Sequence, residues 1–107
     1  MIVPSVIDIY EATRENGFLL NVLLTTTKVQ VAVVSLLPGE EIGSEIDQGD
    51  QLLYAANGQG VAVLNHSNEN FEKGTMFCVP AGARHNVINT GGVPLKLFSI
   101  YAPPQHP

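Results

Sequence analysis

The first feature of this chain that could do chemistry is a set of three oxygen-bearing side chains in residues 45–51 that can share one face of a strand. Glu45 and Asp47 flank Ile46, and successive side chains of a strand point to opposite faces, so both carboxylates share one face. Gln51 joins that face if the strand continues through the bend at Gly49. Two partly desolvated carboxylates about 7 Å apart repel each other, and a divalent cation is one of few ways to keep both ionised. The segment therefore indicates an oxygen-rich cation site.

A second segment, residues 74–89, adds an imidazole. Pro80 fixes its own φ and has no backbone N–H, and Gly82 can adopt a positive φ, so the pair marks a tight turn. The β-branched residues on either side of the turn favour extended backbone. The segment predicts a β-hairpin that displays His85 on its returning strand.

The residue types alone leave a second interpretation open. Glu45 and Asp47 could instead lie on a solvated edge of the fold, with His85 hydrogen-bonded to a backbone carbonyl. A lone histidine does not decide between a cation site and a solvated edge.

The spacing of the second segment is that of a known family signature. Gly74, Pro80, Gly82, His85 and Asn89 follow the pattern Gly-x5-Pro-x-Gly-x2-His-x3-Asn, which resembles the second motif of the cupin family. In that family the histidine points into a small β-barrel and binds a metal ion. The resemblance therefore implies a metal-binding role for His85.

The first cupin motif, Gly-x5-His-x-His-x3-Glu-x6-Gly, is present in outline between Gly39 and Gly58. Glu45, Asp47 and Gln51 replace its two histidines and its glutamate. The segment resembles a subgroup of small single-domain cupins (cupin 2 type) in which Glu and Gln already stand at the outer two positions. A histidine would still be expected at residue 47, so Asp47 is the departure from the pattern. The resemblance covers the chain from about residue 20 to its end.

The resemblance implies that Glu45, Asp47, Gln51 and His85 surround one divalent metal ion. Manganese, iron, zinc and nickel are the candidate ions. A carboxylate at residue 47 shifts the preference from zinc or nickel toward harder ions.

Strand alternation predicts the walls of a pocket beside these ligands. The expected lining residues are Leu53, Ala55, Val87 and Asn89, with Met76 or Phe77 and Phe98 or Ile100 on the opposite wall, where the register is unresolved; Met76 and Phe98 are the preferred pair. Closing the turn that follows it is an alternative role for Asn89. A mostly apolar lining suits a small-molecule ligand whose polar end meets the metal.

Short apolar runs separated by Gly, Pro and Asn predict an all-β fold. The expected strands are residues 29–37, 51–56, 60–65, 75–79, 85–89 and 95–101, and residues 10–16 could form a short helix that Gly17 stops. With the resemblance, this pattern implies a double-stranded β-helix, the cupin jelly-roll barrel, formed as one domain by residues 1–107.

The amino-acid composition limits the classes of partner that the protein can bind. A net charge of −5 and the lack of any basic run exclude nucleic acid and anionic membrane. No leader-like segment or membrane-spanning apolar stretch is visible and there is a single cysteine, which together predict a cytoplasmic protein. Charged residues make up only 14%, and the apolar segment 2–10 could add to a neighbour's sheet, which predicts a homodimer.

The sequence leaves the activity open between two main hypotheses. The first is a metal-dependent enzyme that acts on a small molecule by isomerase- or dioxygenase-like chemistry. The second is a non-catalytic module that binds or senses a small ligand through a degenerate metal site. A filled scaffold without a site fits less well, because Glu45 and Asp47 are unsuited to a core.

Overall fold

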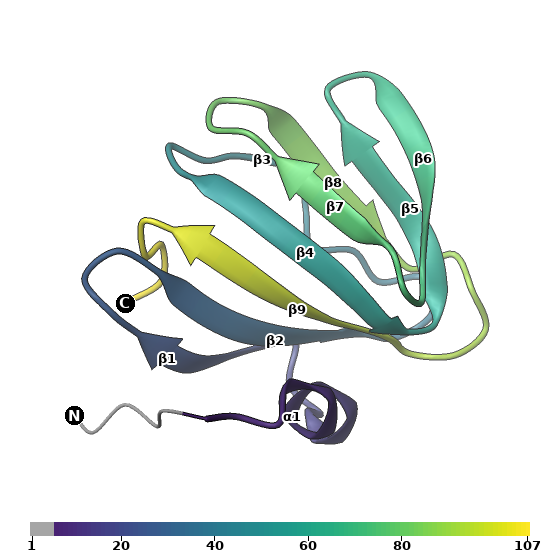
Figure 1. Cartoon of the computed structure of the whole chain (residues 1–107). Helices are drawn as coiled ribbons and strands as arrows, with labels where there is room; N and C mark the ends of the chain where they lie inside the picture. The colour runs from purple at the N-terminus through teal and green to yellow at the C-terminus, as the bar shows by residue number, and fades with distance from the viewer. Residues whose placement is uncertain (1–5) are drawn as a thin grey trace.

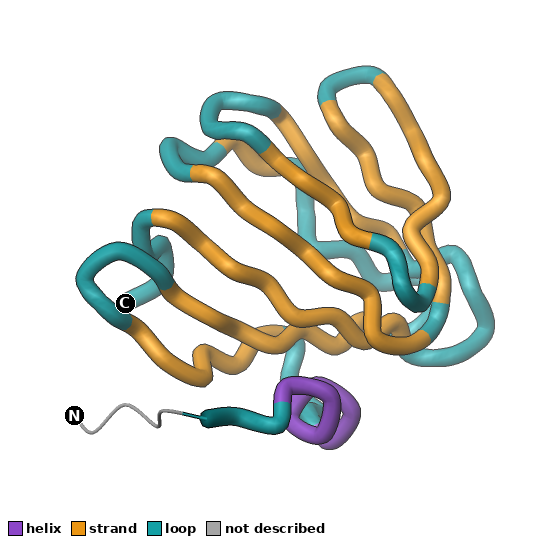
Figure 2. Tube along the Cα trace, viewed as in Figure 1, coloured by secondary structure: helices purple, strands orange, loops and turns teal. Residues whose placement is uncertain are grey.

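The computed structural model describes residues 6–107 and consists mainly of two antiparallel sheets that face each other (Figures 1 and 2). The five-stranded sheet has the order β1 (Leu20–Thr25), β2 (Gln30–Leu36), β9 (Leu95–Ala102), β4 (Asp50–Asn57) and β7 (Met76–Val79). The four-stranded sheet has the order β3 (Glu45–Ile46), β8 (Arg84–Ile88), β5 (Gln59–Leu64) and β6 (Ser67–Glu72). The all-β prediction is confirmed.

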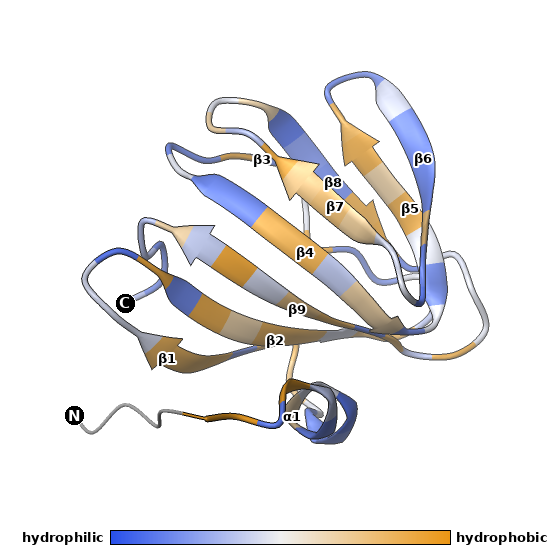
Figure 3. Ribbon diagram, in the orientation of Figure 1, coloured by the Kyte–Doolittle hydropathy of each residue, from blue (hydrophilic) through white to orange (hydrophobic). Residues whose placement is uncertain are grey.

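The core lies between the two sheets, because side chains alternate along the strands that face it. In β4, Leu53 and Ala55 are buried, and in β9 every second side chain from Leu95 to Tyr101 is buried. Figure 3 shows a largely hydrophobic β2 and a largely hydrophilic β6. The buried core cluster comprises Val34, Leu36, Leu53, Ala55, Ala62, Phe71, Val79, Val87, Leu95 and Leu97.

Two strands, β1 and β6, were not expected from the sequence, whereas β3 lies within the strand expected around Glu45 and Asp47. Of the six residues of β6 only Phe71 is buried, so no apolar alternation marks this strand. It forms because its backbone pairs with β5 from Gln59 to Leu64. Whether such an edge segment forms a strand depends on its pairing with a neighbouring strand, which the local sequence does not encode.

The helix α1 (Ile9–Glu15) packs against the outer face of the five-stranded sheet, on β2, β4 and β9. The Asp8 side chain accepts a hydrogen bond from the backbone N–H of Glu11, and this N-cap starts the helix one residue earlier than expected. Asn16 already has extended backbone, so the helix ends before Gly17. Over residues 6–107, no helix is long and apolar enough to cross a membrane.

The segment around His85 is not the hairpin that the sequence predicts. The turn is tight, and Gly82 has a φ of 84°. However, β7 pairs with β4 in one sheet, whereas β8 pairs with β3 and β5 in the other. The turn therefore leads the chain from one sheet to the other, and the backbone N–H of Gly82 donates to the carbonyl of Asp47 at 2.8 Å. His85 enters the barrel from the sheet that faces Gln51.

Asn89 follows β8 and closes the loop to β9. Its Nδ2 donates to the carbonyls of Leu36 and Val93, both at 2.9 Å, and its Oδ1 accepts from the backbone N–H of Gly91 at 2.9 Å. The side chain is buried, so these hydrogen bonds are shielded from water. Asn89 thus has the turn-closing role and lies away from the pocket.

We expect Asn89→Ala to lower the free energy of unfolding by about 3 kcal/mol, since the buried Asn89 side chain makes three hydrogen bonds, each worth about 1 kcal/mol. Urea denaturation measures this value, with Asn70→Ala on the exposed face of β6 as the matched control. Equal, small losses in both variants would contradict the structural role of Asn89.

Candidate metal centre

The four predicted ligands come from four places in the chain and meet at one end of the barrel. Glu45 lies on β3 directly opposite His85 on β8, Asp47 follows β3, and Gln51 lies on β4 of the other sheet. One ligand atom from each of Glu45, Asp47 and His85 can be chosen so that all three lie within 4.8 Å of one another. Gln51 Nε2 lies 3.2 Å from His85 Nε2 and donates to Asp47 Oδ2.

The imidazole of His85 has an oxygen acceptor at each ring nitrogen. Nδ1 lies 3.1 Å from the backbone carbonyl oxygen of Ala83, and Nε2 lies 3.2 Å from Asp47 Oδ2. A neutral imidazole carries one N–H and can donate to only one of these oxygens. If Nδ1 donates to Ala83, the Nε2 lone pair points toward the Asp47 carboxylate and toward Gln51 Nε2, whose amide N–H can donate to it. A metal ion at Nε2 would take the place of that amide N–H and would also be attracted by the Asp47 carboxylate.

The donor set fits a divalent cation. Nδ1–H bound to a backbone carbonyl is the outer contact that orients a metal-ligating histidine. The carboxylates of Glu45 and Asp47 supply anionic ligand atoms, and the imidazole of His85 supplies a neutral one. Turning the Gln51 amide about its terminal bond would present its oxygen in place of its nitrogen. The four residues therefore match a site of mixed oxygen and nitrogen ligands.

The cluster combines features of both sequence interpretations. His85 and Gln51 are only 4% exposed, whereas the Asp47 side chain is 14% exposed and Glu45 is exposed to solvent. The carboxylates thus lie at the mouth of the barrel and the imidazole lies inside it. Water can reach the cluster from the carboxylate side.

A phenol completes this end of the barrel. Tyr101 on β9 is buried and lines the same cavity as Glu45 and His85. Burial raises the pKa of the Tyr101 phenol; the Ser99 hydroxyl opposes this rise, and the nearby charges of Glu45 and Asp47 add to it. Tyr101 therefore keeps its proton at neutral pH and can donate a hydrogen bond into the cavity.

A cavity of about 140 Å³ opens beside the cluster. Its polar end is formed by Glu45, Gln51, His85 and Tyr101, whereas Asp47 lies outside its lining, and its other walls are mostly aliphatic. The lining residues are Leu19, Leu20, Val34, Ile42, Glu45, Gln51, Leu53, His85, Tyr101, Gln105 and His106. Of the pocket walls expected from the sequence, Leu53 lies in this lining.

The other expected walls lie elsewhere. Phe98 points to the outer face of its sheet, where its ring stacks on Tyr54 with centroids 5.1 Å apart. Met76, opposite Tyr54 in the ladder, is 51% exposed, whereas its neighbour Phe77 packs against the core on the same face as Val79. The parity of these two strands depends on their register, which the sequence left unresolved.

Ala55, Val87 and Asn89 share the inward parity of the ligands but lie deeper than the cavity. Ala55 and Val87 belong to the buried core cluster, and Asn89 closes the loop after β8. Parity identifies the face of a strand, whereas depth along the barrel separates core from pocket.

Sequence reasoning missed the carboxyl-terminal residues of the cavity. Gln105 and His106 both line it, although a proline-rich tail is usually exposed. The Oε1 of Gln30 accepts from the backbone N–H groups of Gln105 and His106 at 3.1 and 2.9 Å, which ties the tail down. A glutamine in an otherwise apolar strand was the one local signal of such a contact.

Comparison with known proteins places this geometry in a family. The cupin domain family matches residues 32–101. The chain is 44% identical to YrkC of Bacillus subtilis (strain 168), with 97% of the chain and 60% of that protein covered, so it spans about three fifths of this relative. It is 31% identical to protein L612 of Acanthamoeba polyphaga mimivirus, with 95% of the chain and 67% of that protein covered.

Solved structures agree. The Bacillus halodurans protein BH2720 superimposes with a TM-score of 0.95 at 40% identity, covering 97% of this chain and 84% of that one. An RmlC-like cupin family protein with a double-stranded β-helix fold from Methanocaldococcus jannaschii has a TM-score of 0.76 at 22% identity, covering 84% of both chains, and shows the fold alone. The family match over residues 32–101, together with the two facing sheets, shows that this chain belongs to the cupin family and has its double-stranded β-helix fold.

Proposed function

We propose that this cupin binds one divalent metal ion through Glu45, Asp47, Gln51 and His85, and that a small molecule occupies the adjoining cavity. The carrying observation is the environment of His85, whose two ring nitrogens both face oxygen acceptors 3.1 and 3.2 Å away. A cation placed at the Gln51 amide position would gain both the Nε2 lone pair and the Asp47 carboxylate as ligands.

The ligand set limits the ion. It offers two carboxylates, an amide and one imidazole, a set richer in hard oxygen than in nitrogen. Manganese and ferrous iron suit such a set better than zinc or nickel, although all four ions accept imidazole. Elemental analysis of protein purified without a chelator or a histidine tag identifies the ion.

As a metal-dependent enzyme, the protein would use the bound ion as a Lewis acid on a small oxygen-containing substrate, in an isomerase- or dioxygenase-like reaction. The other tasks belong to residues of the chain. Tyr101 keeps its proton and donates a hydrogen bond to a bound oxygen. Leu53, Val34 and Ile42 hold the apolar part of the ligand and keep water from it.

A module that binds or senses a small ligand without turnover is the second candidate. The exposure of Glu45 and the carboxylate at residue 47 favour it, because both weaken the hold on a transition metal. Metal content separates these candidates only in part, so single-turnover assays on the metal-loaded protein are the deciding measurement.

Single-domain organisation over residues 1–107 and a cytoplasmic address complete the proposal. The one cysteine, Cys78, is an exposed free thiol, which supports a reducing compartment.

We expect His85→Ala to weaken binding of manganese and zinc at least about tenfold, the loss of one ligand worth about 1.4 kcal/mol or more. The fold should persist, with the free energy of unfolding lowered by no more than about 2 kcal/mol, because few hydrogen bonds are lost. Titration calorimetry and urea denaturation measure the two quantities, with His66→Ala in the exposed β5–β6 turn as control. An unfolded variant, or unchanged metal affinity, would make His85 structural.

Asp47→His supplies the histidine that the family pattern leads one to expect. We expect this variant to bind zinc or nickel about tenfold more tightly, since an added imidazole suits these ions better than a carboxylate. Glu69→His on the exposed face of β6 makes the same charge change outside the cluster and should leave the affinity unchanged. Negligible binding in the wild type and in both variants would mean that the four groups do not form a metal site.

We also propose a homodimer, formed through the outer face of the five-stranded sheet. A cross-strand row of mostly apolar side chains lies there: Val31, Ile100, Leu52 and Cys78. A second row, Val33, Phe98, Tyr54 and Met76, is partly covered by α1, because Val33 is fully buried and Tyr10 contacts Tyr54. Leu52 and Met76 are 38% and 51% exposed. The amino-terminal segment expected to mediate pairing lies outside the described residues for 2–5, and residues 9–10 begin α1 instead of a strand.

Light scattering at micromolar concentration should give a dimer mass for the wild type. Leu52→Lys should shift the mass toward the monomer, because a lysine in the centre of the row cannot be buried without a partner charge. Ile46→Lys, at a comparably exposed position on the other sheet, is the control and should stay dimeric. A monomeric wild type would overturn the proposal.

A further inference from the structure

The carboxyl-terminal residues 103–107, here called the tail, are fixed to the barrel by one buried side chain. Gln30, fully buried at the start of β2, accepts from the backbone N–H groups of Gln105 and His106 and donates through Nε2 to the carbonyl of His106 at 2.8 Å. Its second amide N–H reaches Thr25 Oγ1 at 3.0 Å. All polar atoms of a buried glutamine are thus satisfied, mainly by the tail, so the tail has a defined position.

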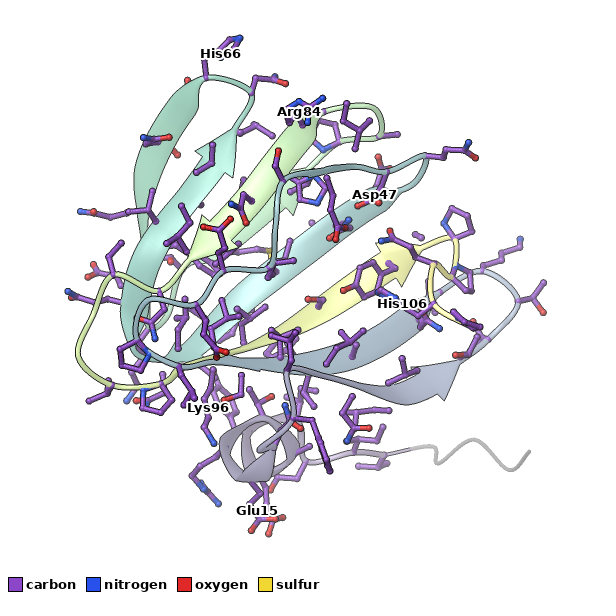
Figure 4. All side chains as sticks on the ribbon, turned by 180° about the vertical axis from the view of Figure 1, so that it is seen from behind. Glu15, Asp47, His66, Arg84, Lys96 and His106 are labelled. Atoms are coloured by element: carbon purple, nitrogen blue, oxygen red, sulfur yellow. The ribbon has the colours of Figure 1, made fainter. Side chains whose placement is uncertain are left out.

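The tail passes over the mouth of the barrel, beside the metal-ligand cluster. A Cβ built on Gly49, in the β3–β4 turn, would lie 2.8 Å from both the Ala102 oxygen and the Pro103 Cδ, so the two segments are in close contact. Gln105 Oε1 accepts from Gln51 Nε2 at 3.4 Å. In Figure 4, Asp47 and His106 lie on the same side of the barrel, whereas Lys96 lies near α1.

His106 carries an unsatisfied polar atom at the cavity. Its ring packs edge-on against Tyr101, with centroids 4.9 Å apart and an interplanar angle of 84°. Its Nε2 is buried and has no hydrogen-bond partner within residues 6–107. Ser99 Oγ, the other such atom in that range, does not line the cavity. A buried ring nitrogen without a partner is costly, and a ligand oxygen in the cavity would relieve that cost.

We propose that the tail completes the ligand pocket and that His106 binds the ligand, through a hydrogen bond between Nε2 and a ligand oxygen. The proposal deepens the proposed function and rests on it, since the same ligand meets the Glu45, Asp47, Gln51 and His85 cluster. Tyr101 links the two groups that would bind the ligand, because its ring contacts His106 and its phenol lies near the charges of Glu45 and Asp47.

Size and polarity define the class of ligand. An engineered apolar cavity of about 150 Å³ holds benzene, and the cavity here is about 140 Å³. Its middle is aliphatic, with polar groups at the cluster and at His106. The ligand is therefore a small cyclic or branched compound with one oxygen group for the metal-ligand cluster and a second oxygen for His106.

The test uses phenol, benzoate and 4-hydroxybenzoate as probes of the full chain, with zinc and without metal. Imidazole NMR signals of His85 and His106 report where a probe binds, and their titration gives its dissociation constant. We expect 4-hydroxybenzoate to bind about tenfold more tightly than benzoate in the zinc-loaded wild type, because its second oxygen reaches His106. His106→Ala should abolish this difference while zinc affinity stays within about twofold, and the control His66→Ala should retain it.

A second pair of variants tests the position of the tail. Gly49→Ala should displace the tail, weaken 4-hydroxybenzoate to the level of benzoate and speed hydrogen exchange at the backbone amides of Gln105 and His106. Gly17→Ala, which has no atom within 4 Å of its new Cβ, should change none of these.

The outcomes separate the two proposals. If no probe shifts the His106 signals with or without metal, or if His106→Ala and His66→Ala weaken binding equally, the role of His106 is wrong even where zinc binds. If zinc does not bind while phenol or 4-hydroxybenzoate shifts His106, the metal centre is wrong and the tail contact stands.

Discussion

A single imidazole placed between two oxygen acceptors is the constraint on which this end of the barrel depends. His85 Nδ1 faces the carbonyl of Ala83 and Nε2 faces the carboxylate of Asp47, and a neutral ring can satisfy only one of them. The backbone geometry enforces this arrangement, because β8 is paired on both sides, with β3 and β5. Nε2 therefore lies between the Asp47 carboxylate and the Gln51 amide, at a position from which it could bind a metal ion together with Asp47.

The barrel has two unlike ends, and their difference follows from packing. At one end Leu36, Leu95 and Phe71 are buried in the continuous core, and Asn89 closes the connecting loop with buried hydrogen bonds. At the other end the inward positions carry polar side chains that cannot fill a dry core without a partner. A cavity between the two regions is therefore apolar on one side and polar on the other.

The tail changes the character of the open end. With Gln30 holding it, Gln105 and His106 become walls of the cavity. The bonds that hold the tail use backbone groups of residues 105 and 106 and leave both side chains free to face the cavity.

The sequence by itself determined the strand-rich fold, the family pattern and the four converging residues. Gly and Pro at fixed spacing mark turns whose geometry other residues adopt poorly, and alternation places Glu45 and Asp47 on one face. Tertiary structure alone decided what depends on register and on contacts between distant segments. These include the outward position of Phe98, the passage of β7 and β8 into different sheets, and the seating of His106. A one-residue shift in pairing reverses the face of every side chain, and the contact of Gln30 with the tail spans three quarters of the chain, so no local pattern encodes either.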